Sequence, residues 1–192
     1  MDLNEKEIRL KTIKAKKMML LFSMLSIAMT FAGLTSAYIV SKSRPDWLKD
    51  FELPFAFIVS TVVIILSSIS IYIAKQSVKN NEVSKTSLWL LITFGLGIIF
   101  VISQFSGFNE LIGLGYFFTG AQSTITTSFL YVLTVLHLAH LFAGLIVLVV
   151  VTINNYKNKY RSEKLGFELA VNFWHFLGIL WLYLFVFLYF FR

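Results

Sequence analysis

The chain has 192 residues, of which 57% are hydrophobic and 14% are charged, and its mean hydropathy of +0.77 is typical of membrane proteins rather than soluble domains. It contains no cysteine, which excludes disulfides, thiolate metal sites, iron–sulfur ligation and covalent haem attachment through a CxxCH motif. The formal net charge of +7 does not indicate nucleic-acid binding, because the basic residues lie between hydrophobic runs instead of forming one patch.

Five apolar segments are long enough to cross a bilayer, whose hydrocarbon core of about 30 Å takes about 20 residues of helix. None of the five contains Lys or Arg, and Pro54 stands at the start of the second, where its missing N–H costs little. We therefore predict an all-α integral membrane protein, a bundle of five transmembrane helices. The predicted spans cover residues 18–40, 54–74, 87–105, 127–153 and 166–191. Residues 1–17 are predicted to form a basic cytoplasmic segment, and residues 18–192 the transmembrane domain.

The first span has some features of a signal peptide, because the basic stretch KTIKAKK precedes it and TSA offers small residues for cleavage. Its apolar run is longer than the roughly 7 to 15 residues of a signal peptide, so we predict a retained helix. Small residues form a stripe along it, which would let another helix approach closely. Packing within the five helices and contact with a partner both explain this stripe, which consists of Ala28, Ala32, Gly33, Ser36 and Ala37.

Polar residues in the next two spans are expected to have local roles. Four hydroxyl side chains in the second span are expected to hydrogen-bond the backbone of their own helix; they are Ser60, Thr61, Ser67 and Ser68. Gln104 stands at the end of the third span, where we expect it to snorkel or to cap the helix. Residues 108–127 are too polar and glycine-rich for a span yet rich in aromatic rings, so we place them at the outer membrane interface.

The distribution of basic residues predicts the orientation, since cytoplasmic loops retain an excess of Lys and Arg. Thirteen of the 17 lie in the N-terminal segment and in the loops after the second and fourth spans, and four lie in the other segments. The N-terminus is therefore expected in the cytoplasm and the C-terminus in the periplasm.

Ionisable side chains are costly inside a membrane and usually mark function. The first four spans contain no Asp, Glu, Lys or Arg, which argues against an ion pump, a proton relay or a transporter of charged substrates. Three histidines remain, His137, His140 and His175. His137 and His140 share a helix face that Gly144 continues. The histidines could form a metal or haem site, or they could hydrogen-bond neighbouring helices and lipids while Gly144 permits close packing; HxxH alone is a weak metal signal.

Several motifs taken together resemble one family. The last span reads GFELAVNFWHFLGILWLYLF from residue 166, and HLAHLFAGL stands at 137–145. FAGLTSAY occupies 31–38, RPDW and ELP follow in the first loop, and WLLITFGLGIIFVISQ occupies 89–104. With these motifs the chain resembles subunit III of the haem-copper (cytochrome c) oxidases, in the short five-helix bacterial form that lacks the family's first two helices.

The resemblance implies contacts with other subunits or with lipid, and no catalytic, cofactor-binding or metal-binding residue on this chain. The residues it implicates are His137, His140 and Gly144 in the fourth span and Glu168, Trp174, His175 and Trp181 in the last. Two departures remove carboxylates: Ile27 stands where the family usually has Glu, and Gly178 where it has Asp. Any family role of those two carboxylates cannot be assumed here.

The resemblance further implies a non-catalytic accessory subunit of a bacterial haem-copper terminal oxidase in aerobic respiratory electron transport. Such a subunit would lie in the inner membrane, pack mainly on subunit I, bind phospholipid and support proton uptake and stability, while haem and copper belong to subunits I and II. Subunit II, a subunit IV and a respiratory supercomplex are further candidate partners.

Three alternatives stay open. The chain could be the corresponding accessory protein of a quinol oxidase or a nitric oxide reductase. It could be an independent metalloprotein that uses the three histidines. A small transporter is disfavoured by the lack of buried charge and of repeat symmetry.

Overall fold

A computed structural model describes residues 3–45, 47–48, 53–120, 123–161 and 164–191. Some residues used above lie outside this description, namely Asp46, Lys49, Glu52 and Arg192.

The described residues form five long α-helices and one short 3₁₀ turn, with no strand among them. The helices are α1 (Leu3–Ser41), α2 (Phe55–Lys79), α3 (Val83–Gly113), α4 (Ile125–Tyr156) and α5 (Leu165–Phe190), and the turn η1 is Lys159–Arg161. All five helices are long and apolar enough to cross a membrane. The prediction of an all-α membrane protein with five spans is confirmed.

The helices extend beyond the predicted spans because a bilayer limits the apolar run but not the hydrogen-bonded helix. α1 begins at Leu3 and continues through the basic segment without a break. α3 continues to Gly113, so residues 108–113, the first part of the segment placed at the interface, are helical. Local signals fix two of the starts: Pro54 precedes α2, and Thr124 accepts a hydrogen bond from the Thr127 N–H in a capping box that begins α4.

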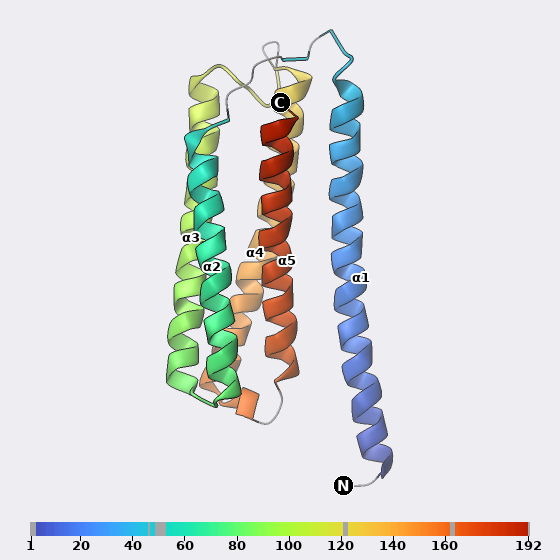
Figure 1. The fold of residues 1–192 in the computed structure, drawn as a ribbon, viewed down its shortest axis with the longest axis vertical. Coiled ribbons are helices and arrows are strands. Elements are labelled where there is room, and N and C mark those ends of the chain that lie inside the picture. The colour runs from blue at the N-terminus through green and yellow to red at the C-terminus, as the bar shows by residue number, and fades with distance from the viewer. Residues whose placement is uncertain (1–2, 46, 49–52, 121–122, 162–163, 192) are drawn as a thin grey trace.

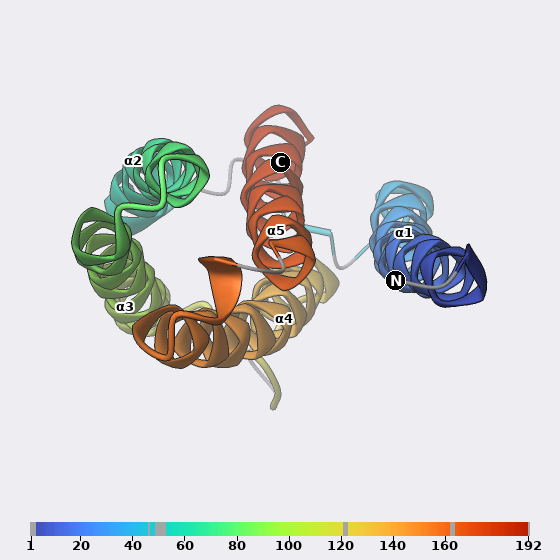
Figure 2. The ribbon, with the colours of Figure 1, turned by 90° about the horizontal axis from the view of Figure 1, so that it is seen from below.

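The five helices run up and down in turn (Figure 1). The N-terminus and the α2–α3 and α4–α5 connections lie at one end, which we call the basic end, and the C-terminus lies at the other (Figure 1). Seen along the bundle, α2, α3 and α4 follow an arc that α5 closes, while α1 stands beside α4 and α5 at the edge (Figure 2). α1 is therefore the helix with the least cover from the rest of the chain, and only 11% of its most apolar window is buried.

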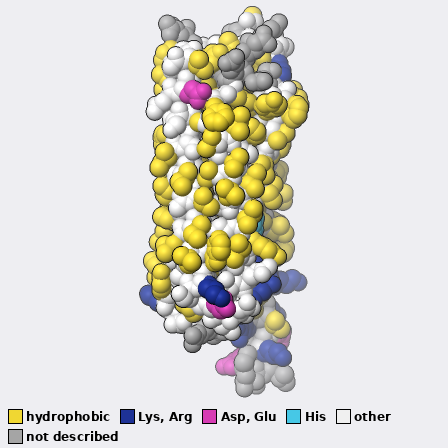
Figure 3. Space-filling model, turned by 60° about the vertical axis from the view of Figure 1, so that its left-hand side comes forward, with side chains coloured by type: hydrophobic (Ala, Val, Ile, Leu, Met, Phe, Trp, Pro, Cys, Tyr) yellow, Lys and Arg dark blue, Asp and Glu magenta, His cyan; other side chains and the backbone are white. Residues whose placement is uncertain are grey.

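The outer surface is apolar over the middle of the bundle, as expected of a protein whose solvent is lipid. Hydrophobic side chains cover the face in Figure 3, and charged side chains gather toward its two ends. The interior is filled by aromatic and aliphatic side chains; among the largest that are fully buried are Phe31, Tyr38, Phe57, Phe100, Trp174 and Trp181.

The small-residue stripe of α1 faces away from the bundle. Ala32, Gly33, Ser36 and Ala37 are exposed, and a Cβ added at Gly33 would meet nothing within 4 Å. Ala28 is half-buried. Packing within this chain therefore does not account for the four exposed residues.

Candidate functional site

Trp174 of α5 inserts between two glycines on neighbouring helices. A Cβ added at Gly97 of α3 would lie 3.0 Å from the Trp174 ring, and one added at Gly144 of α4 would lie 3.3 Å from it. At Gly144 the added Cβ would also come within 2.7 Å of a methyl carbon of Leu177. The Trp174 indole N–H donates to the Ser67 hydroxyl of α2 at 3.0 Å, so one buried side chain joins α5 to three other helices.

Trp181 repeats this arrangement two turns further along the same face of α5. Its indole N–H donates to Thr61 of α2 at 3.1 Å. Its ring meets Phe57 and Phe100 edge-on, with centroids 5.8 and 5.1 Å away, and lies 5.2 Å from the His137 ring. Trp174 and Trp181 thus form the centre of the helix packing, with apolar bodies in the core and each N–H satisfied.

His137 and His140 share a face of α4, and α1 packs on them. The ring of Phe31, which is fully buried, lies 6.4 Å from the His137 ring and 5.8 Å from the His140 ring. His140 Nδ1 lies 2.8 Å from the Leu136 carbonyl oxygen, within its own helix. His137 is fully buried, and neither of its ring nitrogens has a hydrogen-bond partner among the described residues. The pair forms the surface of α4 on which α1 packs.

One expectation about polar residues is wrong, and another is incomplete. Gln104 neither snorkels nor caps: it is fully buried, and its Nε2 donates to Ser60 of α2 at 2.7 Å. In the second span, Ser60 and Thr61 do donate to the Phe57 carbonyl, but they also accept from Gln104 and Trp181, and Ser67 accepts from Trp174. These hydroxyls connect helices, because each keeps a lone pair for an N–H on a neighbouring helix.

His175 and Glu168 lie on another side of α5. His175 is half-buried in a groove between α2 and α5. Glu168 lies in the first turn of α5, where the helix dipole favours a carboxylate.

The structure does not assemble the three histidines into a metal site. Among the described residues, no three His, Cys, Asp or Glu side chains come together as possible ligands of one metal ion. His137 is enclosed by aromatic rings, and His175 lines the groove between α2 and α5. The described geometry is that of helix contacts.

Comparison with known proteins identifies the family. A family model for cytochrome c oxidase subunit III matches residues 10–192. The chain belongs to this family. It is 30% identical to cytochrome c oxidase subunit 3 of Thermostichus vulcanus over 88% of the chain and 84% of that protein. It is 31% identical to the same subunit of Bacillus sp. (strain PS3), over 83% of the chain and 77% of the relative.

A further relative carries a different name. The cytochrome bo(3) ubiquinol oxidase subunit 3 of Buchnera aphidicola is 36% identical over 70% of the chain and 68% of that protein. The chain is therefore a multi-pass membrane protein of the haem-copper oxidase subunit III family, a non-redox accessory subunit that associates with the other oxidase subunits.

The two departures from the family pattern lie on different helices. Ile27 is half-buried on α1 and packs against the core. Gly178 is buried on α5, where an added Cβ would lie 3.2 Å from the Ser68 hydroxyl oxygen.

Sequence reasoning missed three contact residues: Phe31, Gly97 and Gln104. The FGLG pattern around Gly97 is a signal that could have indicated a close helix approach.

Proposed function

We propose that this chain is the accessory subunit III of a bacterial haem-copper terminal oxidase in the inner membrane, where it packs on subunit I, binds phospholipid and supports proton uptake and stability. The observation that carries the proposal is the family match over residues 10–192 together with a core built from helix contacts. Haem and copper are assigned to subunits I and II.

The exposed side of α1 supports contact with another subunit. Phe22 and Met29 are 60% and 67% exposed on the side away from the bundle, in line with the small residues of the stripe. In lipid, close approach at small residues is a main source of helix association. We assign this side of α1 to a neighbouring oxidase subunit.

A cavity at the basic end supports lipid contact. It has a volume of about 120 Å³ and is lined by Lys16 of α1, Lys159, Tyr160 and the first residues of α5. Burial raises the pKa of the Tyr160 hydroxyl, and the Asn154 side chain opposes this through a hydrogen bond, so Tyr160 stays protonated and can donate at neutral pH. The positive-inside rule assigns this end to the cytoplasm, where anionic headgroups attract lysines.

A role in proton uptake would have to be indirect, because Ile27 and Gly178 replace the two carboxylates of the family. We assign the chain a positioning effect on subunit I, through the exposed side of α1.

Purification of the complex tests the proposal. The chain, tagged at its C-terminus, is purified from native membranes in mild detergent, and the redox difference spectrum is recorded with mass spectrometry of the co-purifying chains. We expect haem together with subunits I and II. Haem or metal on this chain alone, or a chain that purifies without haem proteins, would overturn the assignment.

The relative from Buchnera aphidicola favours a second candidate, subunit III of a quinol oxidase. The same purified complex distinguishes the two, because a cytochrome c oxidase consumes oxygen with reduced cytochrome c, whereas a quinol oxidase consumes it with a reduced quinol.

A further inference from the structure

A groove of about 400 Å³ runs along the boundary of α2 and α5. Ile65 and Ile69 of α2 and Ile179 and Leu182 of α5 form its apolar walls. The groove is deepest at Gly178, because this residue has no side chain. A Cβ added at Gly178 would lie 3.2 Å from the Ser68 hydroxyl oxygen. The groove opens to the outer surface of the bundle, where lipid surrounds the protein.

The groove changes from polar to apolar along its length. Lys75, Tyr72, Ser68 and Ile65 follow one another at intervals of three or four residues on α2 and so share one face. At 1.5 Å per residue, this series spans about 15 Å from the basic end toward the middle of the bundle. On α5, which runs the opposite way, His175 lies opposite the polar part and Leu182 opposite the apolar part.

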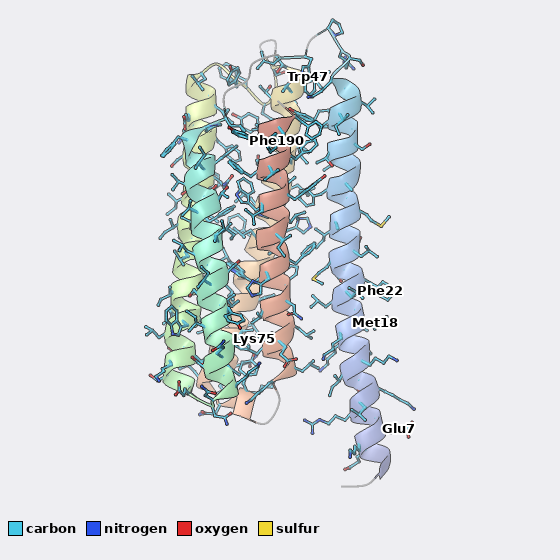
Figure 4. All side chains as sticks on the ribbon, viewed as in Figure 1. Glu7, Met18, Phe22, Trp47, Lys75 and Phe190 are labelled. Atoms are coloured by element: carbon cyan, nitrogen blue, oxygen red, sulfur yellow. The ribbon has the colours of Figure 1, made fainter. Side chains whose placement is uncertain are left out.

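Basic side chains lie beside the polar part of the groove, at the basic end of the bundle. Lys75 lies near the basic end of α2 (Figure 4) and is half-buried. Lys79 lies one turn further along α2, and the Lys164 ammonium donates to the Lys79 carbonyl at 3.2 Å, which brings a third ammonium to this corner. Glu168 adds a carboxylate in the first turn of α5, so the described residues of this corner include three lysines and one glutamate.

We propose that this groove binds an anionic glycerophospholipid, with its phosphate at Lys75, its ester region at Tyr72 and His175, and one acyl chain against the isoleucines. Charge complementarity identifies the occupant: basic pockets between transmembrane helices on the cytoplasmic side bind anionic headgroups, and the apolar part suits hydrocarbon. Gly178 contributes by its lack of a carboxylate, since Asp at this position would put a negative charge in the floor. The inference rests on the proposed lipid-binding function and adds a second location, separate from the cavity at Lys16 and Tyr160.

The depth of the groups matches such a lipid. The phosphate of a phospholipid lies at the interface, and its ester groups and chains lie successively deeper. Lys75 ends the apolar run of α2 at the basic end, whereas Tyr72 and His175 lie nearer the bundle middle. A side-chain ammonium for phosphate and hydrogen-bonding groups for ester oxygens therefore occur in the order that the lipid requires.

The test counts phospholipids on the purified complex. Tagged wild-type and variant complexes are washed in detergent, titrated with phosphatidylglycerol or phosphatidylcholine, and examined by native mass spectrometry. Lys75→Gln removes the charge with little change in size, and Ser68→Phe fills the groove. Lys85→Gln and Ser103→Phe are the matched controls, because Lys85 pairs with Glu82 at 3.2 Å and Ser103 bonds its own helix outside the groove.

We expect the wild type to bind phosphatidylglycerol in preference to phosphatidylcholine. Lys75→Gln should weaken phosphatidylglycerol binding about fivefold, the effect of one basic residue near a membrane surface, and Ser68→Phe should release one lipid per complex. The controls should bind as the wild type does. Equal binding by Lys75→Gln and wild type, or equal binding of the two lipids by wild type, would overturn the inference. A chain that purifies without haem subunits would contradict the proposed function instead, and lipid counting on that chain would still decide the inference.

Discussion

Gly144 sets how closely α4 approaches α5. A Cβ there would come within 2.7 Å of the Leu177 side chain and 3.3 Å of the Trp174 ring. We predict that Gly144→Leu costs about 1–3 kcal/mol through overpacking and lowers the yield of assembled complex in native gels. Gly95→Leu is the control, because a Cβ at Gly95 would meet nothing within 4 Å. Equal yields for the two variants would contradict the close contact.

Trp181 joins α5 to α2 through a hydrogen bond that can be removed while one aromatic ring stays in the core. Trp181→Phe deletes the N–H that donates to Thr61 and keeps an aromatic ring. Because such bonds in membranes contribute about 0.6 kcal/mol on average and at most about 1.7, we expect a modest fall in the temperature at which the detergent-solubilised complex loses this subunit. Trp89→Phe on α3, where the indole is half-buried, should leave that temperature nearly unchanged.

The residue scale is also where sequence reasoning erred. Gln104 stands near the end of the predicted third span, and an amide in that position suggests an interface. The helix continues nine residues beyond it, and its side chain points at Ser60 on a helix that precedes it by more than forty residues. The partner of a polar side chain in a membrane depends on which helix lies beside it, which a local pattern does not contain.

At the scale of elements, α1 is distinct because few contacts hold it. Three side chains make its main links to α4 and α5: Phe31 lies against the two histidines, and Thr35 shares a hydrogen bond of 2.8 Å with Tyr183. Tyr38 lies against Phe129 and Phe187, with ring centroids 5.9 and 5.3 Å away. Its remaining surface is largely exposed, and its N-terminal turns extend past the other helices (Figure 1). A helix held by so few contacts depends strongly on each of them.

We predict that Phe31→Ala loosens α1 from the bundle. The free energy that holds α1 against the bundle should fall by about 2–3 kcal/mol. This is near the lower limit for Phe→Ala, because lipid rather than water surrounds the helix pair. Exchange of backbone amide hydrogens should accelerate in the C-terminal half of α1, which contains Phe31, more than in α2 to α5. Phe22→Ala is the control, since Phe22 is 60% exposed. Similar exchange in the two variants would show that Phe31 does not anchor the helix.

At the scale of the whole molecule, we expect the basic end of the bundle to lie in the cytoplasm. The chain has no cysteine, so a single introduced thiol is a unique label. Ser84→Cys lies at the basic end and Ser123→Cys at the other, and both serines are accessible enough to substitute. A membrane-impermeant maleimide on spheroplasts should label Ser123→Cys directly and Ser84→Cys only after lysis. The reverse pattern would contradict the cytoplasmic N-terminus.

The sequence by itself determined the membrane class, the five spans and the family. These follow from quantities that are local in the chain: the length of each apolar run against the bilayer thickness, and motifs within single helices. It also predicted which side chains to examine, because polar and small residues are conspicuous in an apolar run.

Only the tertiary structure decided which of those residues meet. In the folded chain, Trp174 lies between Gly97 and Gly144. The hydroxyls of α2 bond to other helices, and the small residues of α1 face away from the bundle. The physical reason is that lipid is as apolar as a helix surface, so hydrophobicity fixes that a helix spans the membrane but not its rotation or its neighbours. Those depend on side-chain shape and on a few interhelical hydrogen bonds, which exist once the helices are side by side.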